Sequence, residues 1–79
     1  MFKNKTIIIS GSNGLIGKKL KEYFISEGAN VIGLDLKKTD NVTIKCDITN
    51  ETSVRKAFEL IKKKYISIDL LINNASKTL

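Results

Sequence analysis

The sequence predicts an α/β fold, a partial parallel sheet of about four strands in the order 3-2-1-4 with two main helices. Two observations lead to this prediction. Apolar residues cluster in short runs, and the first and last runs lack polar alternation, as expected for strands buried on both faces of a parallel sheet. Stretches with apolar residues at helical spacing lie between the first and second runs and between the third and fourth. The runs cover residues 6–9, 31–34, 42–46 and 69–73.

Length and composition are those of one globular unit. The chain has 79 residues, 42% hydrophobic and 28% charged, and no proline, so we expect one partial domain over residues 1–79. Its single cysteine, Cys46, excludes an internal disulfide, and the lack of histidine disfavours a zinc site. We expect no bound metal and a cytoplasmic location, because the first apolar run is also too short for a signal peptide or a membrane span.

The net charge of +6 raises the question of a nucleic-acid or membrane partner. The lysines are dispersed over two predicted helices and a loop, and those at a helix C-terminus complement the helix dipole. We therefore expect solvated helix faces, with no nucleic acid and no membrane as partner. These lysines are Lys18, Lys19, Lys21, Lys37, Lys38, Lys62, Lys63 and Lys64.

A first helix is predicted between the first two runs. Gly28 stands where a left-handed C-terminal cap is needed. We expect the apolar side chains of this helix, aromatic rings included, to pack against the sheet. They are Ile16, Leu20, Tyr23, Phe24 and Ile25.

A second helix is predicted between the third and fourth runs. Asn50 or Thr49 is expected as its N-cap, and Glu51 lies in its first turn. The apolar residues of this helix again recur at helical spacing, so we expect them to face the sheet. They are Val54, Ala57, Phe58, Ile61 and Tyr65.

The link between the second and third runs is too short for a helix. Six residues lie between Asp35 and Val42, whereas parallel neighbours usually need a crossover of about a dozen or more residues. Six extended residues reach roughly 20 Å, enough to run back along a short strand. We expect a bare loop there, and one helix on each face of the sheet.

A glycine-rich loop joins the first predicted strand to the first predicted helix. In Rossmann-like folds such a loop holds a dinucleotide pyrophosphate, because the helix directs free N–H groups and its positive dipole end at the phosphates. We expect Gly11 to make the tight turn, Gly14 to allow close approach of the pyrophosphate and Gly17 to let the helix pack on its strand. The glycine spacing excludes the phosphate-binding loop of NTPases. The expected cofactor-binding residues here are Gly11, Ser12, Asn13, Gly14, Leu15, Ile16 and Gly17.

An acid, Asp35, ends the second run. In this fold that position puts the carboxylate beside the adenosine ribose, where it accepts hydrogen bonds from both hydroxyls and repels a 2′-phosphate. NAD is therefore favoured over NADP as the cofactor. Lys37 and Lys38 weaken the preference, because flexible ammonium groups could partly neutralise a phosphate.

Four motifs in chain order resemble the N-terminal half of a short-chain dehydrogenase/reductase: the loop at 10–17, Asp35, and the segments at 46–49 and 72–76. The resemblance implies that Asp47 and Ile48 lie by the adenine ring. It also implies that Asn73, Asn74 and Ala75 pass the nicotinamide-side ribose, with Asn74 and Ala75 contacting the cofactor. Two alternatives stay open, Asp47 as a helix-capping carboxylate and the asparagines as a polar strand end that caps loose backbone groups.

The sequence departs from the family pattern in two ways. The spacing of Gly11, Gly14 and Gly17 is typical of the extended branch, whereas Asn73-Asn74-Ala75 is typical of the shorter-subunit branch. In addition, the resemblance implies a catalytic serine and a tyrosine followed four residues later by lysine, yet Tyr23 precedes Glu27 and Tyr65 precedes Asp69. No catalytic residue can therefore be assigned in this chain.

The leading hypothesis is the NAD(P)-binding portion of a short-chain dehydrogenase/reductase, a hydride-transfer oxidoreductase, truncated before its catalytic residues and inactive alone. The alternative is a stand-alone, non-catalytic dinucleotide-binding module. We expect weak or no NAD affinity for residues 1–79. We also expect self-association through the open edge of the last strand.

Overall fold

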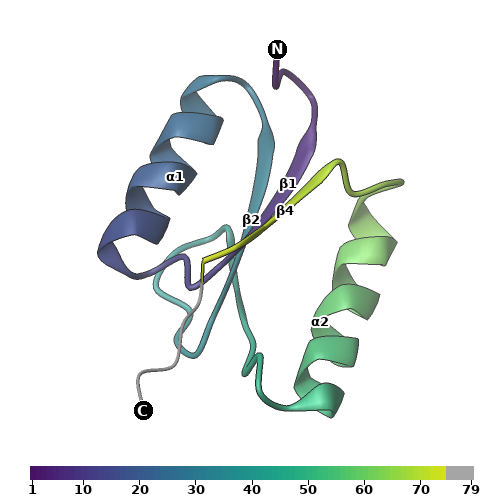
Figure 1. Ribbon diagram of the computed structural model, residues 1–79. Coiled ribbons are helices and arrows are strands. Elements are labelled where there is room, and N and C mark those ends of the chain that lie inside the picture. The colour runs from purple at the N-terminus through teal and green to yellow at the C-terminus, as the bar shows by residue number, and fades with distance from the viewer. Residues whose placement is uncertain (75–79) are drawn as a thin grey trace.

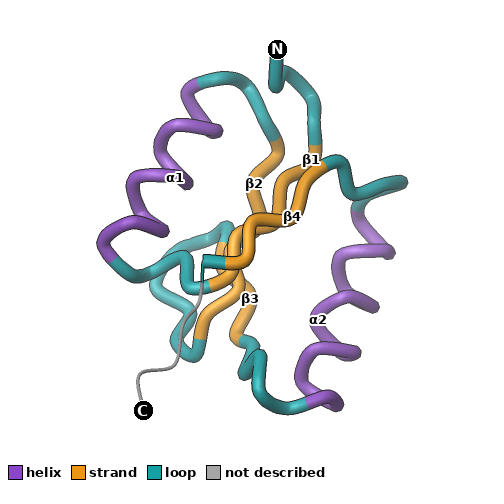
Figure 2. Tube along the Cα trace, viewed as in Figure 1, coloured by secondary structure: helices purple, strands orange, loops and turns teal. Residues whose placement is uncertain are grey.

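The computed structural model describes residues 1–74 and forms a single four-stranded sheet with a helix on each face. All strand pairs are parallel and their order is β3-β2-β1-β4, which confirms the predicted fold class and strand order. Figure 1 shows α1 and α2 on opposite sides of the sheet, and Figure 2 shows the strands side by side between them. The elements are β1 (Thr6–Ser10), α1 (Leu15–Ser26), β2 (Asn30–Asp35), β3 (Thr43–Lys45), α2 (Glu51–Lys64) and β4 (Leu70–Asn73).

Strand β1 is an interior strand of the sheet, and this position explains its run of three isoleucines. It pairs with β2 on one side and β4 on the other, and Ile7, Ile8 and Ile9 are all fully buried. Because successive side chains of a strand point to opposite faces, Ile8 enters one hydrophobic cluster while Ile7 and Ile9 enter another. The run therefore supplies both cores.

The core on the α1 side is smaller than predicted. Phe24 is buried with Ile7 and Ile9, and Leu20 packs against the cluster. Three expected core residues are instead largely exposed: Ile16 at 64%, Tyr23 at 52% and Ile25 at 50%. The prediction of core packing for them was wrong because a single helix on this face buries only a narrow stripe. Tyr23 packs edge-on against the Phe24 ring and the Phe2 ring.

The core on the α2 side follows the predicted helical spacing. Ala57 and Ile61 are buried against Ile8, Ile32, Leu34 and Cys46, while Val54, Phe58 and Tyr65 pack around them. Asn50 is the N-cap, and its side-chain oxygen accepts a hydrogen bond from the Ser53 N–H at 3.0 Å. The first turn carries Glu51 and the last turn three lysines, so both ends complement the helix dipole.

The chain reverses after α1 at Gly28, as predicted. Gly28 has φ +81°, a left-handed conformation that costs other L-residues free energy. Its N–H donates to the Ile25 carbonyl, and Ala29 N–H donates to the Phe24 carbonyl, so the last carbonyls of the helix are satisfied.

The bare loop between β2 and β3 is held by α1. Lys21 is only 6% exposed, and its Nζ lies 2.6 Å from an Asp40 oxygen. Asp40 also accepts hydrogen bonds from Thr43 Oγ1 and Val42 N–H, and Lys38 Nζ donates to the backbone carbonyls of Asp40 and Thr43. The expectation of a solvated Lys21 was wrong, because the missing crossover helix leaves α1 directly beside this loop. The ion pair joins the buried Lys21 of α1 to the exposed Asp40 of the loop.

Strand β4 is the least buried strand. Leu70 and Leu71 are 38% and 54% exposed, and within the described residues β4 pairs only with β1. Asp69, just before β4, accepts a hydrogen bond from Thr6 N–H and donates its own N–H to the Thr6 carbonyl. As for membrane insertion, neither helix in residues 1–74 has the length and apolar character needed to cross a bilayer.

Replacing Lys21 with methionine tests the ion pair between Lys21 and Asp40. The hydrogen bond from Lys21, followed by that from Thr43, lowers the pKa of Asp40 from 3.8 to about 2. A lowered carboxyl pKa stabilises the fold above pH 4, and this contribution is lost as the pH falls from about 4 to about 2. We expect Lys21→Met to reduce the free energy of unfolding at pH 7 by about 1 kcal/mol, after allowing for the exposure of Asp40 to solvent. It should also flatten the loss of stability between these pH values.

Urea unfolding at a series of pH values measures both effects. Lys19→Met is the matched control, because Lys19 is an exposed lysine of the same helix. Equal losses in the two variants would contradict a special role for the Lys21–Asp40 pair.

Candidate functional site

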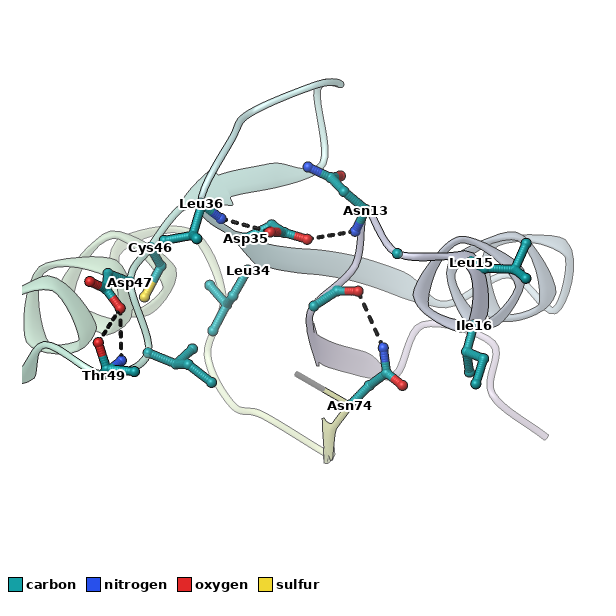
Figure 3. Close-up of a pocket in the computed structure, with 13 residues that line it drawn as sticks. Asn13, Leu15, Ile16, Leu34, Asp35, Leu36, Cys46, Asp47, Thr49 and Asn74 are labelled. Atoms are coloured by element: carbon teal, nitrogen blue, oxygen red, sulfur yellow. Dashed lines mark hydrogen bonds between the residues drawn. The ribbon is translucent and has the colours of Figure 1, made fainter. Parts of the chain in front are cut away.

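A cavity of about 900 Å³ opens at the carboxyl ends of the parallel strands, beside the N-terminus of α1. Ligands of open α/β sheets bind at this end, where neighbouring connections leave in opposite directions. Here the chain leaves β1 toward β2 through α1 and leaves β3 toward β4 through α2, on the other face. Its lining residues, most of them labelled in Figure 3, are Gly11, Asn13, Gly14, Leu15, Ile16, Leu34, Asp35, Leu36, Cys46, Asp47, Ile48, Thr49 and Asn74.

The N-terminus of α1 is uncapped by any side chain. Its N-cap is Gly14, and its first turn contains no acid, in contrast to α2. The first backbone hydrogen bond of the helix runs from Lys18 N–H to the Gly14 carbonyl, so the preceding N–H groups have no intrahelical partner. Leu15 and Ile16, which carry two of these groups, line the cavity. The positive end of the helix dipole therefore faces an open space that suits an anion.

The glycine loop owes its shape to Gly11 and Gly17. Gly11 has φ +67°, and its N–H donates to the Leu34 carbonyl at 2.8 Å. A Cβ on Gly17 would overlap the Gly11 carbonyl oxygen and lie 2.8 Å from Ser12 Cα. The α1 backbone thus rests directly on the loop. Gly17 itself does not line the cavity.

Gly14 lies in a different environment. A Cβ there would meet one protein atom, the Gly11 carbonyl oxygen, at an ordinary contact distance of 3.4 Å. Its φ of −71° is also accessible to any residue. Within the described residues, protein packing does not require glycine at this position, whereas the cavity it lines would be narrowed by a side chain.

Ser12 is directed away from the cavity. Its side chain is fully buried, and a Cβ on Gly33 of β2 would overlap Ser12 Oγ. The hydroxyl has no hydrogen-bond partner within residues 1–74. Ser12 therefore supports the loop from beneath, and its side chain does not reach the site expected from the sequence.

Asp35 joins the end of β2 to the glycine loop. One carboxylate oxygen accepts the Asn13 N–H at 2.8 Å and the other accepts the Leu36 N–H at 2.7 Å. Figure 3 shows Asp35 between these two residues at the edge of the cavity. The carboxylate is half-buried and its position is fixed from both sides.

The segment after β3 forms the far wall. Asp47 Oδ1 accepts hydrogen bonds from the N–H and the hydroxyl of Thr49, at 2.9 and 2.6 Å, while Asn50 caps α2. Asp47 therefore stabilises the turn that leads into the helix, and the alternative of a direct helix cap is not realised. Ile48 lines the cavity and is 42% exposed.

Four lining residues escaped the sequence interpretation: Leu34, Leu36, Cys46 and Thr49. Leu36 carries the clearest missed signal. It directly follows the ribose-binding candidate Asp35, and its N–H donates to the Asp35 carboxylate. Leu34 and Cys46, by contrast, are also members of the α2-side core.

The end of β4 contributes polar groups. Asn74 Nδ2 donates to the Gly11 carbonyl at 3.2 Å, and Ser10 Oγ donates to Asn73 Oδ1 at 3.0 Å. Asn74 therefore bonds a backbone carbonyl of the glycine loop, as in the alternative interpretation, whereas Asn73 bonds a side-chain hydroxyl. Asn74 also lines the cavity. Ala75, the last expected site residue, lies outside the described residues.

The described residues of the cavity supply groups that can bind a ligand. Among residues 1–74, no group of three His, Cys, Asp or Glu residues is arranged to hold a metal ion. Tyr23 packs on aromatic rings on the α1 side and Tyr65 packs on the α2-side core, and neither lines the cavity. The arrangement offers an anion site, a fixed carboxylate and an apolar wall.

Comparison with known proteins gives a consistent result. The family model of the short chain dehydrogenases matches residues 5–78. A short chain dehydrogenase of Leptospira borgpetersenii, solved with bound NAD+, is 30% identical with a TM-score of 0.88, over 99% of this chain and 34% of that one. Ligand-free aldohexose dehydrogenase of Thermoplasma acidophilum is 35% identical with a TM-score of 0.87, over 95% and 31%. An NAD-dependent glycerol dehydrogenase of Listeria innocua is 31% identical, over 96% and 34%.

The chain thus spans about a third of the length of these relatives. All three alignments cover nearly the whole of this chain.

Gly17→Ala and Gly14→Ala separate packing from site shape. We expect Gly17→Ala to lower the free energy of unfolding by about 2 kcal/mol or more, because its Cβ overlaps backbone that cannot move aside cheaply. Gly14→Ala should cost less than about 1 kcal/mol, because its Cβ meets open space apart from one ordinary contact. Thermal or urea unfolding followed by circular dichroism measures both. Equal losses would show that α1 does not rest on the Gly11–Ser12 backbone.

Proposed function

The chain belongs to the short-chain dehydrogenase family, and from this premise we propose that it is the dinucleotide-binding portion of an NAD-dependent oxidoreductase. The observation that carries the proposal is the uncapped N-terminus of α1, which faces the cavity beside the fixed carboxylate of Asp35. A dinucleotide presents a pyrophosphate anion beside the hydroxyl groups of a ribose. The helix N-terminus suits the anion and the carboxylate suits the hydroxyl groups.

The pyrophosphate would lie against the start of α1. The N–H groups of Leu15 and Ile16 have no intrahelical partner, and Gly14 leaves room for close approach. No lysine or arginine is among the cavity-lining residues of the described chain. Backbone N–H groups and the helix dipole would therefore carry the phosphate interaction.

The adenosine would lie between β2 and β3. Both Asp35 oxygens already accept one N–H, and each carboxylate oxygen can accept a second hydrogen bond, here from a ribose hydroxyl. Leu36 and Ile48 supply exposed apolar surface for the adenine ring, and Asp47 lies beside Ile48. A negative carboxylate at the ribose disfavours a 2′-phosphate, so we propose NAD as the cofactor in preference to NADP.

Hydride transfer would require groups beyond those of this chain. We propose that the tyrosine, lysine and serine of the family reaction belong to further sequence, and that residues 1–79 alone produce no NADH from any substrate. The nicotinamide half of the cofactor would have few contacts here, so NAD affinity should be weak. We place the protein in the cytoplasm on its single unpaired cysteine.

The exposed edge of β4 bears on the alternative of a stand-alone module. Leu70 and Leu71 of this edge strand are both exposed, on opposite faces of the sheet, and Ile66 and Ile68 in the segment before the strand are exposed as well. An open apolar edge favours pairing with another strand. We propose that this edge is covered in the working protein, by further sequence in the fragment hypothesis or by a second copy in the module hypothesis.

Sedimentation of the purified chain distinguishes the two hypotheses. A stand-alone module should be a monomer or a discrete dimer with micromolar NAD affinity. The fragment should self-associate without a defined stoichiometry, because its β4 edge has no dedicated partner. Leu71→Lys, which adds a charge to the edge, should reduce that association. A stable dimer that binds NAD tightly would contradict the fragment hypothesis.

Titration with ADP-ribose tests the binding proposal itself, because this probe keeps the pyrophosphate and the adenosine and lacks the nicotinamide ring. We expect a dissociation constant in the millimolar range, with NMR shifts concentrated at the start of α1, at Leu36 and at Ile48. Asp35→Asn should weaken binding about tenfold through loss of a charged acceptor. Glu59→Gln makes the same chemical change at an exposed position of α2 and should have no effect. Absence of any shifts at the start of α1 would refute the proposed function.

A further inference from the structure

The loop that follows β2 is tied to the glycine loop by a single side chain. Asn13 Nδ2 donates to the Lys37 carbonyl at 2.6 Å, and Asn13 Oδ1 accepts the Thr39 hydroxyl at 2.8 Å. We call these two bonds the Asn13–Thr39 clasp. In Figure 3 the carboxamide of Asn13 is directed away from the Asp35 carboxylate, while the Asn13 backbone N–H donates to it. One residue thus fixes both Asp35 and the loop beyond it.

The loop is also fixed at its other end. Lys38 Nζ donates to the carbonyls of Asp40 and Thr43 at 3.0 and 2.8 Å, and Asp40 is paired with the buried Lys21. The Lys38 ammonium is therefore turned toward β3 and held by two carbonyl oxygens. The two lysines that could neutralise a phosphate beside Asp35 belong to this loop, so its position decides where their charges lie.

A ribose 2′-phosphate beside Asp35 would need a cation close enough to offset repulsion by the carboxylate. The attraction between two charges falls with distance and with salt screening, so only an ammonium group close to the phosphate would offset the repulsion. The clasp fixes the Lys37 carbonyl and the Thr39 hydroxyl, on either side of Lys38, and so keeps the Lys38 ammonium within reach of its two carbonyls. A loop released from the clasp could bring an ammonium group of Lys37 or Lys38 toward the phosphate.

We infer that the Asn13–Thr39 clasp is a specificity determinant, and that it disfavours 2′-phosphorylated dinucleotides by holding the loop after β2 where the Lys38 ammonium is kept on the Asp40 and Thr43 carbonyls. The inference rests on the proposed function and adds to it two positioning residues. Thr39 is not among the residues that line the cavity. Its effect would therefore be exerted through Asn13 and the loop, with no contact to the nucleotide.

Two substitutions at Thr39 provide a matched test. Thr39→Val keeps the shape of the side chain but removes the hydroxyl, whereas Thr39→Ser keeps the hydroxyl. The full chain and both variants are titrated with ADP-ribose and with 2′-phospho-ADP-ribose, and the measured quantity is the ratio of the two dissociation constants. We expect Thr39→Val to reduce the discrimination against the 2′-phosphate about fivefold, the effect of one hydrogen bond. Thr39→Ser should retain the original ratio.

The outcomes separate the inference from the function on which it rests. If the unmodified chain binds ADP-ribose and Thr39→Val leaves the ratio unchanged, the inference is wrong and the proposed function stands. An equal loss of affinity for both probes would reduce Thr39 to a structural role and would also overturn the inference. If the unmodified chain binds neither probe, the proposed function fails and the inference with it.

Lys38→Met in the Thr39→Val background should restore part of the discrimination if Lys38 is the released cation, whereas Lys37→Met should do so if Lys37 is.

Discussion

Direct contact between the α1 backbone and the glycine loop determines where the site lies. At Gly17 the helix comes so close to the Gly11 carbonyl and to Ser12 Cα that no Cβ fits between them. A second contact of the same kind lies beneath the loop, where Ser12 rests on Gly33 of β2. These two glycines let the loop lie flat on the end of the sheet. The N-terminus of α1 is thereby directed at the cavity, and the Asn13 N–H reaches Asp35.

The elements of this fold could be predicted because their signals are local. The unbroken apolar run of β1 is typical of a strand buried on both faces. The regular apolar stripe of α2 is typical of a helix buried on one face. The strand order followed from the short link after Asp35, which left no room for a helix. The Asp35 position in the site likewise follows from its place at the end of β2.

Side chains whose partners are distant in sequence could not be predicted. The sequence predicts Lys21 on a solvated helix face, because nothing in it indicates that the fold brings Asp40 beside this lysine. The sequence predicts Ser12 as a loop residue that faces the ligand, whereas in the fold its side chain lies against Gly33. Helical spacing predicts Tyr23 and Ile25 in the core. How much of α1 is buried, however, depends on how many helices cover that face of the sheet. In each case the deciding contact is tertiary, and one sequence contains no record of it.

The two hydrogen bonds to Asp35 explain how a small chain could hold the proposed ribose site ready for a ligand. In the absence of ligand, a carboxylate without hydrogen-bond donors would repel the surrounding acceptors and would be free to rotate. Here the N–H groups of Asn13 and Leu36 hold one oxygen each, so the carboxylate is oriented before any ligand arrives. Because each oxygen keeps a further acceptor position, ribose hydroxyls could bind without displacing either N–H. The same bonds that close the glycine loop onto β2 would therefore persist in the complex, and binding would cost little reorganisation of the protein.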